Sequence, residues 1–111
     1  MEKVYNKLVR DNIPHIIKEN GQMPITRILE IDEYKKELEK KFYEEYEEVI
    51  QASNSEERIE ELADVLEIIR SLAKIENKTL EDIINMANQK NKKRGSFDDM
   101  IFLEKVIENN N

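Results

Sequence analysis

A wide apolar surface at helical spacing, between residues 55 and 73, is the feature that most constrains the fold of this chain. Its members recur three and four positions apart, as on one side of an α-helix: Ile59, Leu62, Val65, Leu66, Ile68, Ile69, Leu72 and Ala73. A helix that is apolar around so much of its circumference must be covered by other helices. It is therefore expected at the centre of an all-α protein.

Composition favours the same fold class. The 111 residues include only two Gly and two Pro, and 39% of them are charged, so the chain has few turn formers and many helix formers. A chain of this length fits one domain, which we assign to residues 1–111.

Three further helical segments are predicted from apolar spacing and end signals: residues 9–20, which end before Gly21, residues 32–52, opened by Asp32 as N-cap, and the segment from the cap Thr79 to Gly95. Residues 24–31 begin with Pro and are rich in β-branched side chains, which suggests an extended stretch or an edge strand.

Charge and hydropathy limit the partners and the location. Residues 30–67 hold 15 Asp or Glu against 5 Lys or Arg, and the whole chain has a formal net charge of −7. Such an acidic field discourages nucleic acid as a direct partner, because phosphate backbones are held by Lys and Arg. The chain has no Cys, no apolar run of membrane-spanning length and no signal-peptide core, so we predict a cytoplasmic protein without a membrane partner.

Two clusters of carboxylates lie on the two longest predicted helices. Glu44, Glu45 and Glu48 form an EExxE motif, and Glu61 and Asp64 form an ExxD motif. At 100° per residue, Glu45 falls at the edge of its helix's apolar stripe, and Glu61 aligns with apolar residues of the central helix. The acids of the two helices are thus expected to face each other. Partly buried carboxylates without a counter-charge are strongly unfavourable. Protonation, Lys or Arg partners, or a divalent cation would remove this free-energy cost.

Other acids have a simpler interpretation, because a Glu-rich helix face is most often solvated surface. This group comprises Glu47, Glu56, Glu57, Glu60 and Glu67. The single His15 is expected to be a surface or packing residue. For the paired motifs, a donor set of oxygens without His or Cys suits magnesium or manganese.

The EExxE motif, a spacer of 12 residues and the ExxD motif resemble the signature of the all-α nucleoside triphosphate pyrophosphohydrolases. These form the MazG-like superfamily, which includes phosphoribosyl-ATP pyrophosphohydrolase. The opening YNKLVRDNIP (residues 5–14), ELADVLE (61–67) and KRGSF (93–97) also resemble the phosphoribosyl-ATP-pyrophosphohydrolase-like branch.

The resemblance implies a four-helix MazG-like bundle that hydrolyses a nucleoside triphosphate between the α and β phosphates, giving a nucleoside monophosphate and pyrophosphate. It implies Mg²⁺, with Mn²⁺ as a substitute, held by Glu45, Glu48, Glu61 and Asp64. Glu44 matches the first acid of the motif, and we assign it, together with Glu45, a catalytic role such as orienting water. Related sequences carry an acid where this chain has His15.

A triphosphate also requires positive side chains near its distal phosphates. The candidates are Lys90, Lys93, Arg94, Lys7 and Arg10. For the lysines near residue 93, an alternative is that they complement the dipole at the end of the last helix.

The central helix carries more apolar surface than three short neighbours can cover, which predicts a homodimer or homotetramer. The resemblance likewise implies dimers or tetramers, with sites near the subunit interfaces.

Three functions stay open at this point. The first is a magnesium-dependent nucleotide pyrophosphohydrolase, for example one that removes noncanonical nucleotides. The second is the phosphoribosyl-ATP pyrophosphohydrolase of histidine biosynthesis. The third is a noncatalytic helical oligomer that binds a nucleotide or a protein.

Overall fold

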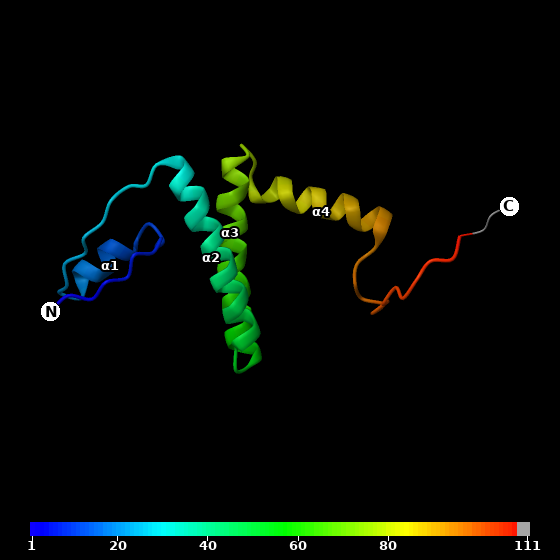
Figure 1. Cartoon of the computed structure of the whole chain (residues 1–111), viewed down its shortest axis with the longest axis horizontal. Coiled ribbons are helices and arrows are strands. Elements are labelled where there is room, and N and C mark those ends of the chain that lie inside the picture. Colours follow the sequence, from blue (N-terminus) through cyan, green and yellow to red (C-terminus); the bar gives the residue numbers. More distant parts are fainter. Residues whose placement is uncertain (109–111) are drawn as a thin grey trace.

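The computed structural model describes residues 1–108, and in them the chain is all-α (Figure 1), which confirms the predicted class. Its four helices are α1 (Ile13–Glu19), α2 (Ile31–Gln51), α3 (Ser55–Ile75) and α4 (Leu80–Arg94). None of these helices is long and apolar enough to cross a membrane.

Helices α2 and α3 form a hairpin, and Figure 1 shows them side by side near the turn, with the start of α2 tilted away from the end of α3. The turn between them is tied by short-range hydrogen bonds. The Asn54 side chain accepts from the Glu57 backbone N–H at 2.9 Å, and the Glu57 carboxylate accepts from the Ser53 N–H at 3.0 Å. The Arg58 guanidinium donates to the carbonyl oxygens of Val49 and Ala52 at the end of α2. These bonds satisfy groups that helix ends leave unpaired.

The small core lies between these helices. Leu38 of α2 and Ile68 and Ala73 of α3 are buried, with at most 7% of their surface exposed. Among the described residues, α3 packs against both α2 and α4, whereas α1 packs against no other helix. The prediction that this segment forms the central helix is therefore confirmed.

The first helix is shorter than predicted. The apolar spacing suggested residues 9–20, but α1 begins at Ile13, with Pro14 in its first turn. Proline is well placed there, because its missing N–H would have no partner in a first turn. At the other end, Gly21 has φ +79°, and the N–H groups of Gly21 and Gln22 bond to the carbonyls of Lys18 and Ile17. This is the glycine-ended cap expected of a helix stop.

Of the two alternatives predicted for residues 24–31, an extended stretch or an edge strand, the edge strand is wrong. Residues 22–30 are neither helix nor strand, and the part of the chain that the structure describes contains no strand with which they could pair. The last residue of that stretch, Ile31, is instead the first residue of α2, and Glu30 rather than Asp32 is the N-cap. β-branched composition alone does not form a strand without a neighbouring partner.

A well-defined corner joins α3 to α4. Asn77 has φ +60°, and the N–H groups of Asn77 and Lys78 bond to the carbonyls of Lys74 and Ala73. Directly afterwards, Thr79 and Asp82 form a reciprocal capping box, so α4 runs from the predicted cap to the predicted stop at Gly95. No free linker separates the two caps, and the corner therefore directs α4 away from the hairpin.

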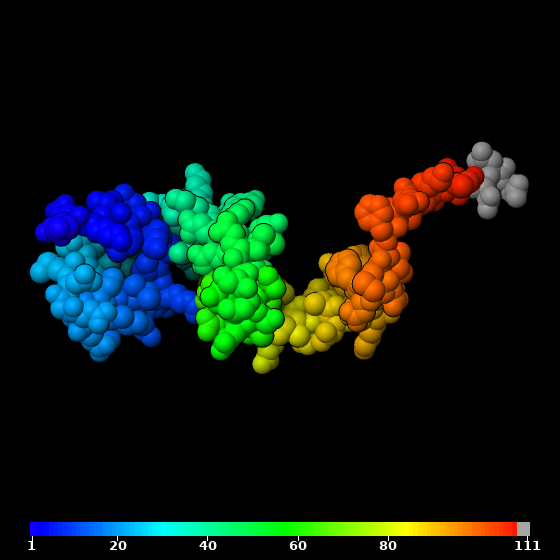
Figure 2. Space-filling model, turned by 90° about the horizontal axis from the view of Figure 1, so that it is seen from below, coloured from blue at the N-terminus to red at the C-terminus, as the bar shows by residue number. Residues whose placement is uncertain are grey.

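The molecule is open rather than closed around one core. The N-terminal segment with α1 lies on one side of the hairpin, and α4 leaves on the other side, as both Figure 1 and Figure 2 show. The chain extends 73 Å along its longest axis. Contacts between helices within residues 1–108 are those of α2 with α3 and of α3 with α4.

Candidate metal centre

Three carboxylates from the two hairpin helices gather at one point. Glu45 of α2 and Glu61 and Asp64 of α3 each offer an oxygen, and these oxygens all lie within 4.8 Å of one another. Glu61 and Asp64 are three residues apart and share a face of α3, and the hairpin brings Glu45 opposite them. The sequence expectation that acids of the two helices face each other holds for these three residues.

The burial of two oxygens makes this cluster unlike ordinary surface acids. Oε2 of Glu45 and Oε2 of Glu61 are inaccessible to solvent, and neither has a hydrogen-bond donor among the described residues. Leaving a buried polar atom without a partner is unfavourable, and more so when the atom is charged. A cation between these oxygens would remove that cost, so the donor set fits a hard divalent ion such as Mg²⁺.

The crowding of acids also changes their proton affinity. The pKa of Glu61 is raised to about 7, first by a hydrogen bond shared with the Glu48 carboxyl, then by burial and by the charges of Glu48, Asp64 and Glu45. The pKa of Glu45 is raised as well, first by burial and then by the charges of Glu48 and Asp64. Ionised carboxylates only accept hydrogen bonds, so the nearness of the Glu48 carboxyl favours the protonated form of Glu61.

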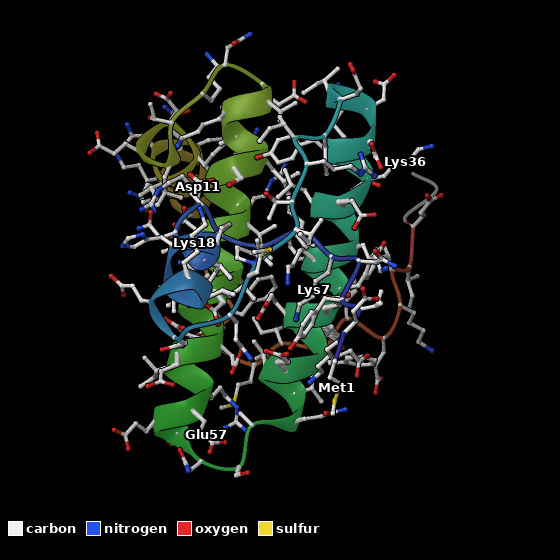
Figure 3. All side chains as sticks on the ribbon, turned by 90° about the vertical axis from the view of Figure 1, so that its left-hand side faces the viewer. Met1, Lys7, Asp11, Lys18, Lys36 and Glu57 are labelled. Atoms are coloured by element: carbon white, nitrogen blue, oxygen red, sulfur yellow. The ribbon has the colours of Figure 1, made fainter. Side chains whose placement is uncertain are left out.

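Arg10 supplies a positive charge from outside the hairpin. Its guanidinium donates to Oδ1 of Asp64 at 2.5 Å. The N-terminal segment that carries it crosses the face of α2 and α3 (Figure 3), where Lys7 and Asp11 mark its path. A residue 54 positions away in the sequence therefore partly neutralises one of the three clustered acids.

A recess beside this ion pair contains two residues that the sequence argument did not select. Arg10 and Asp64 line it together with Glu67 and Arg70, and with Glu60, Ala63 and Leu66. Arg70 forms an ion pair with Glu67. Glu67 belongs to the acids predicted to be outward solvating charge, some of them paired with Lys or Arg neighbours, and its ion pair with Arg70 agrees with that prediction. Its spacing of three residues from both Asp64 and Arg70 is the signal that places all three on one side of α3.

Two acids of the first motif stand apart from the group of three. Glu48 is exposed and is not among the three clustered carboxylates, although its charge and hydrogen bonding act on Glu45 and Glu61. Glu44 instead forms an ion pair with Lys41 at 3.7 Å. Of the three acids of the EExxE motif, Glu45 is therefore inside the cluster, Glu48 lies beside it, and Glu44 is paired with Lys41.

The five predicted phosphate-binding residues lie in different parts of the molecule, and only one of them lies at the carboxylate cluster. Lys90, Lys93 and Arg94 lie on the exposed second half of α4, which projects away from the hairpin (Figure 1). Lys7 lies over the ring of Tyr5, 5.4 Å from its centroid. Of these five candidates, Arg10 is the one whose side chain bonds to a predicted metal ligand within residues 1–108.

His15 is a surface residue, as predicted. Its side chain is 73% exposed, and its Nε2 lies 2.9 Å from the Glu19 carboxylate, one helical turn further along α1. It is on a different element from the clustered acids.

Comparisons of the chain with protein-family models, with curated proteins and with solved structures find no match. The resemblance to the MazG-like superfamily accordingly stays a prediction that rests on the motifs themselves. Residues 1–108 form an all-α structure with a carboxylate cluster in a helical hairpin.

Proposed function

We propose that this chain is a magnesium-dependent nucleoside triphosphate pyrophosphohydrolase. The observation that carries the proposal is the convergence of Glu45, Glu61 and Asp64, with two of their oxygens buried and without donors. The order and spacing of the motifs that supply these residues support the same reaction. The products would be a nucleoside monophosphate and pyrophosphate.

Glu45, Glu61 and Asp64 would hold the ion, with Glu48 as an additional ligand or as the residue that orients a ligand. The bound ion would polarise the scissile phosphate and lower the pKa of an attacking water. Magnesium prefers about six oxygen ligands and usually keeps several waters. Three or four carboxylates leave room for both water and phosphate oxygens.

The reaction also requires the transfer of one proton and the binding of the negatively charged phosphates of the substrate. Water would add across the anhydride bond between the α and β phosphates, its proton passing to a carboxylate and pyrophosphate leaving with the bridging oxygen. The raised pKa of Glu61 in the ion-free chain means that binding of the ion near neutral pH would displace a proton from this carboxyl. Glu44 keeps its predicted role in orienting water, which requires release of its ion pair with Lys41.

Arg10 is the strongest phosphate-binding candidate. It already lies at the carboxylate cluster, where it bonds to Asp64. If a divalent ion takes that carboxylate, the guanidinium becomes free to bind a phosphate, for which its planar donor geometry is suited.

The test is pyrophosphate release from canonical and modified nucleoside triphosphates, with and without Mg²⁺. We expect magnesium-dependent release that falls by more than about 100-fold in Glu45→Ala and in Asp64→Ala, a loss at or above that seen when metal-supporting residues are removed. Glu47→Ala is the matched control, because Glu47 is an exposed neighbour on α2 and should retain activity.

The alternatives give different results in the same assay. Turnover of phosphoribosyl-ATP but of no other nucleotide would identify the histidine-biosynthesis reaction. Normal turnover in a folded Asp64→Ala protein would exclude the proposed site. No turnover of any nucleotide, together with no stabilisation by Mg²⁺, would favour a noncatalytic binding protein. The proposal also keeps the cytoplasmic location predicted from the sequence.

A further inference from the structure

The N-terminal segment lies on the hairpin without packing into it. We call residues 1–29 the strap. Its helix, α1, packs against no other helix of the described chain, and none of residues 1–29 is buried. Even large apolar side chains of the strap stay open, since Met23, Ile25 and Ile28 are 84%, 87% and 96% exposed. Because so little apolar surface is covered, the hydrophobic effect contributes little to holding the strap in place.

Two arginines supply the polar attachments of the strap. At its base, Arg27 donates two hydrogen bonds to the Glu33 carboxylate of α2, at 2.6 and 3.0 Å. Further from the base, Arg10 donates to Asp64 of α3 at 2.5 Å. Within residues 1–108, no other hydrogen bond or ion pair joins residues 1–26 to α2, α3 or α4. The strap is therefore tethered at its base and fastened over the hairpin by one arginine.

The two attachments differ in what else their carboxylates can bind. Asp64 belongs to the carboxylate cluster, whereas Glu33 does not. Once Asp64 coordinates a divalent ion, Arg10 would share that carboxylate with a second cation, well inside the ~8 Å over which salt screens charges at physiological ionic strength. Such competition is reciprocal. The ion must weaken the fastening of Arg10 by the same factor by which Arg10 weakens binding of the ion.

The charges of the two parts favour the same result. The strap holds 5 Lys or Arg against 3 Asp or Glu, and it crosses the face of α2 and α3 (Figure 3), where residues 30–67 hold 15 Asp or Glu against 5 Lys or Arg. The acidic field of the hairpin therefore attracts the strap as a whole. A divalent cation at the cluster would cancel part of that field, which weakens the attraction together with the direct contact.

We propose that the strap is a gate over the carboxylate cluster that a divalent ion opens. In the ion-free chain Arg10 fastens the strap to Asp64. Occupancy of the cluster releases the strap at Arg10 and leaves it tethered at Arg27. Release removes one wall of the recess beside Asp64, which Arg10 lines together with Arg70, and so widens access to the cluster. This inference rests on the ion site of the proposed function and not on the hydrolysis.

The first test measures the distance between strap and hairpin by pulsed electron paramagnetic resonance. The natural chain has no cysteine, so nitroxide labels can be attached at Lys18→Cys of α1 and Glu56→Cys of α3, two exposed positions outside the cluster. Dilution with unlabelled chains restricts the signal to distances within one chain. We expect a narrow distribution with a chelator and a broader, longer one with Mg²⁺, in which the released fraction rises at least about twofold.

Variants of the labelled chain assign the effect to Arg10. Arg10→Gln should give the broad distribution without any ion, and Mg²⁺ should change it little. Lys3→Gln is the matched control, because Lys3 is a strap cation that lies over the ring of Tyr5, and it should respond as the unaltered strap does. Labels at Lys36→Cys and Glu56→Cys, both within the hairpin, should show no change with Mg²⁺.

Trypsin detects the same release in the unaltered chain. It cuts after an Arg or Lys whose side chain enters its acidic pocket, so a guanidinium that is held by Asp64 is a poor site. We expect Mg²⁺ to raise the rate of cutting after Arg10 by about two- to fivefold. Cutting after Arg27 is the internal control, because its partner Glu33 is outside the cluster, and its rate should stay unchanged.

Titration calorimetry with Mg²⁺ separates this proposal from the ion site on which it rests. If Mg²⁺ binds while the strap distance and the rate of cutting after Arg10 stay unchanged, the gate is excluded and the ion site stands. If no Mg²⁺ binds, both are overturned. Equal responses to Mg²⁺ in Arg10→Gln and Lys3→Gln would assign the release to general charge screening and would also exclude the gate. No nucleotide is used, so absence of hydrolysis would leave the result intact.

Discussion

Glu61 carries the clearest electrostatic signature of the candidate site. Its pKa is raised to about 7 by the Glu48 hydrogen bond, by burial and by neighbouring charges. The folded chain therefore binds a proton that the unfolded chain has already released at the same pH. A site built in this way is destabilised near neutral pH until a cation or a proton occupies it.

That shift predicts how stability depends on pH. Because the pKa of Glu61 is higher in the folded than in the unfolded chain, where it is about 4.5, the free energy of unfolding should fall as pH rises from about 4.5 to about 7. Thermal melts in the presence of a chelator measure this slope. Glu61→Gln should flatten it and Glu47→Gln should not. Equal slopes in all three proteins would contradict the assigned cause.

The ion pair between Arg10 and Asp64 predicts competition with metal. Since Arg10 occupies a carboxylate that we assign to the ion, Arg10→Gln should tighten divalent-ion binding by about two- to fivefold, the range expected for an exposed ion pair of less than ~1 kcal/mol. Titration calorimetry with Mg²⁺ or Mn²⁺ checks this. Arg27→Gln is the control, because Arg27 pairs with the distant Glu33. Weaker ion binding in Arg10→Gln would show that the arginine supports the site instead.

At the level of helices, the sequence signals worked best where a boundary depends on neighbouring residues. The Thr79 cap and the Gly95 stop were predicted correctly because capping uses groups within a few positions. Apolar spacing placed the start of α1 four residues too early, and Pro14 is the sequence signal that limits how early the regular helix can begin. The edge strand failed because a strand needs a partner elsewhere in the chain.

The hairpin turn gives a stability prediction of its own. Asn54 accepts a hydrogen bond from the Glu57 N–H at the start of α3, so Asn54→Ala should lower the free energy of unfolding by about 1 kcal/mol. Chemical denaturation measures the change. Ser53→Ala is a close control, because Ser53 contributes its backbone N–H rather than its side chain. An equal loss in both variants would assign the effect to turn composition rather than to the cap.

At the scale of the whole molecule, the large exposed apolar area predicts that stability depends on association between copies of the chain. If a second copy covers the exposed apolar residues of α2 and α3, as the predicted homodimer or homotetramer requires, folding and association are coupled, and the melting temperature should rise with protein concentration. Scanning calorimetry over a dilution series tests this. Leu62→Ala should lower the melting temperature, whereas Met23→Ala, which changes an exposed apolar residue outside α2 and α3, should leave it unchanged. A concentration-independent melting temperature would indicate a chain that is stable alone.

The sequence by itself determined the helical class, most helix ends and the acidic motifs, because these depend on spacing and on hydrogen bonds between near neighbours. Only the tertiary structure decided which acids meet. It brought Glu45 to Glu61 and Asp64, left Glu48 beside them and paired Glu44 with Lys41. It also placed Arg10 on Asp64 and carried the basic end of α4 away from the hairpin. Such pairings depend on how distant segments of the chain pack together and on the direction in which α4 leaves the corner after α3. Helical periodicity carries no information about either of these.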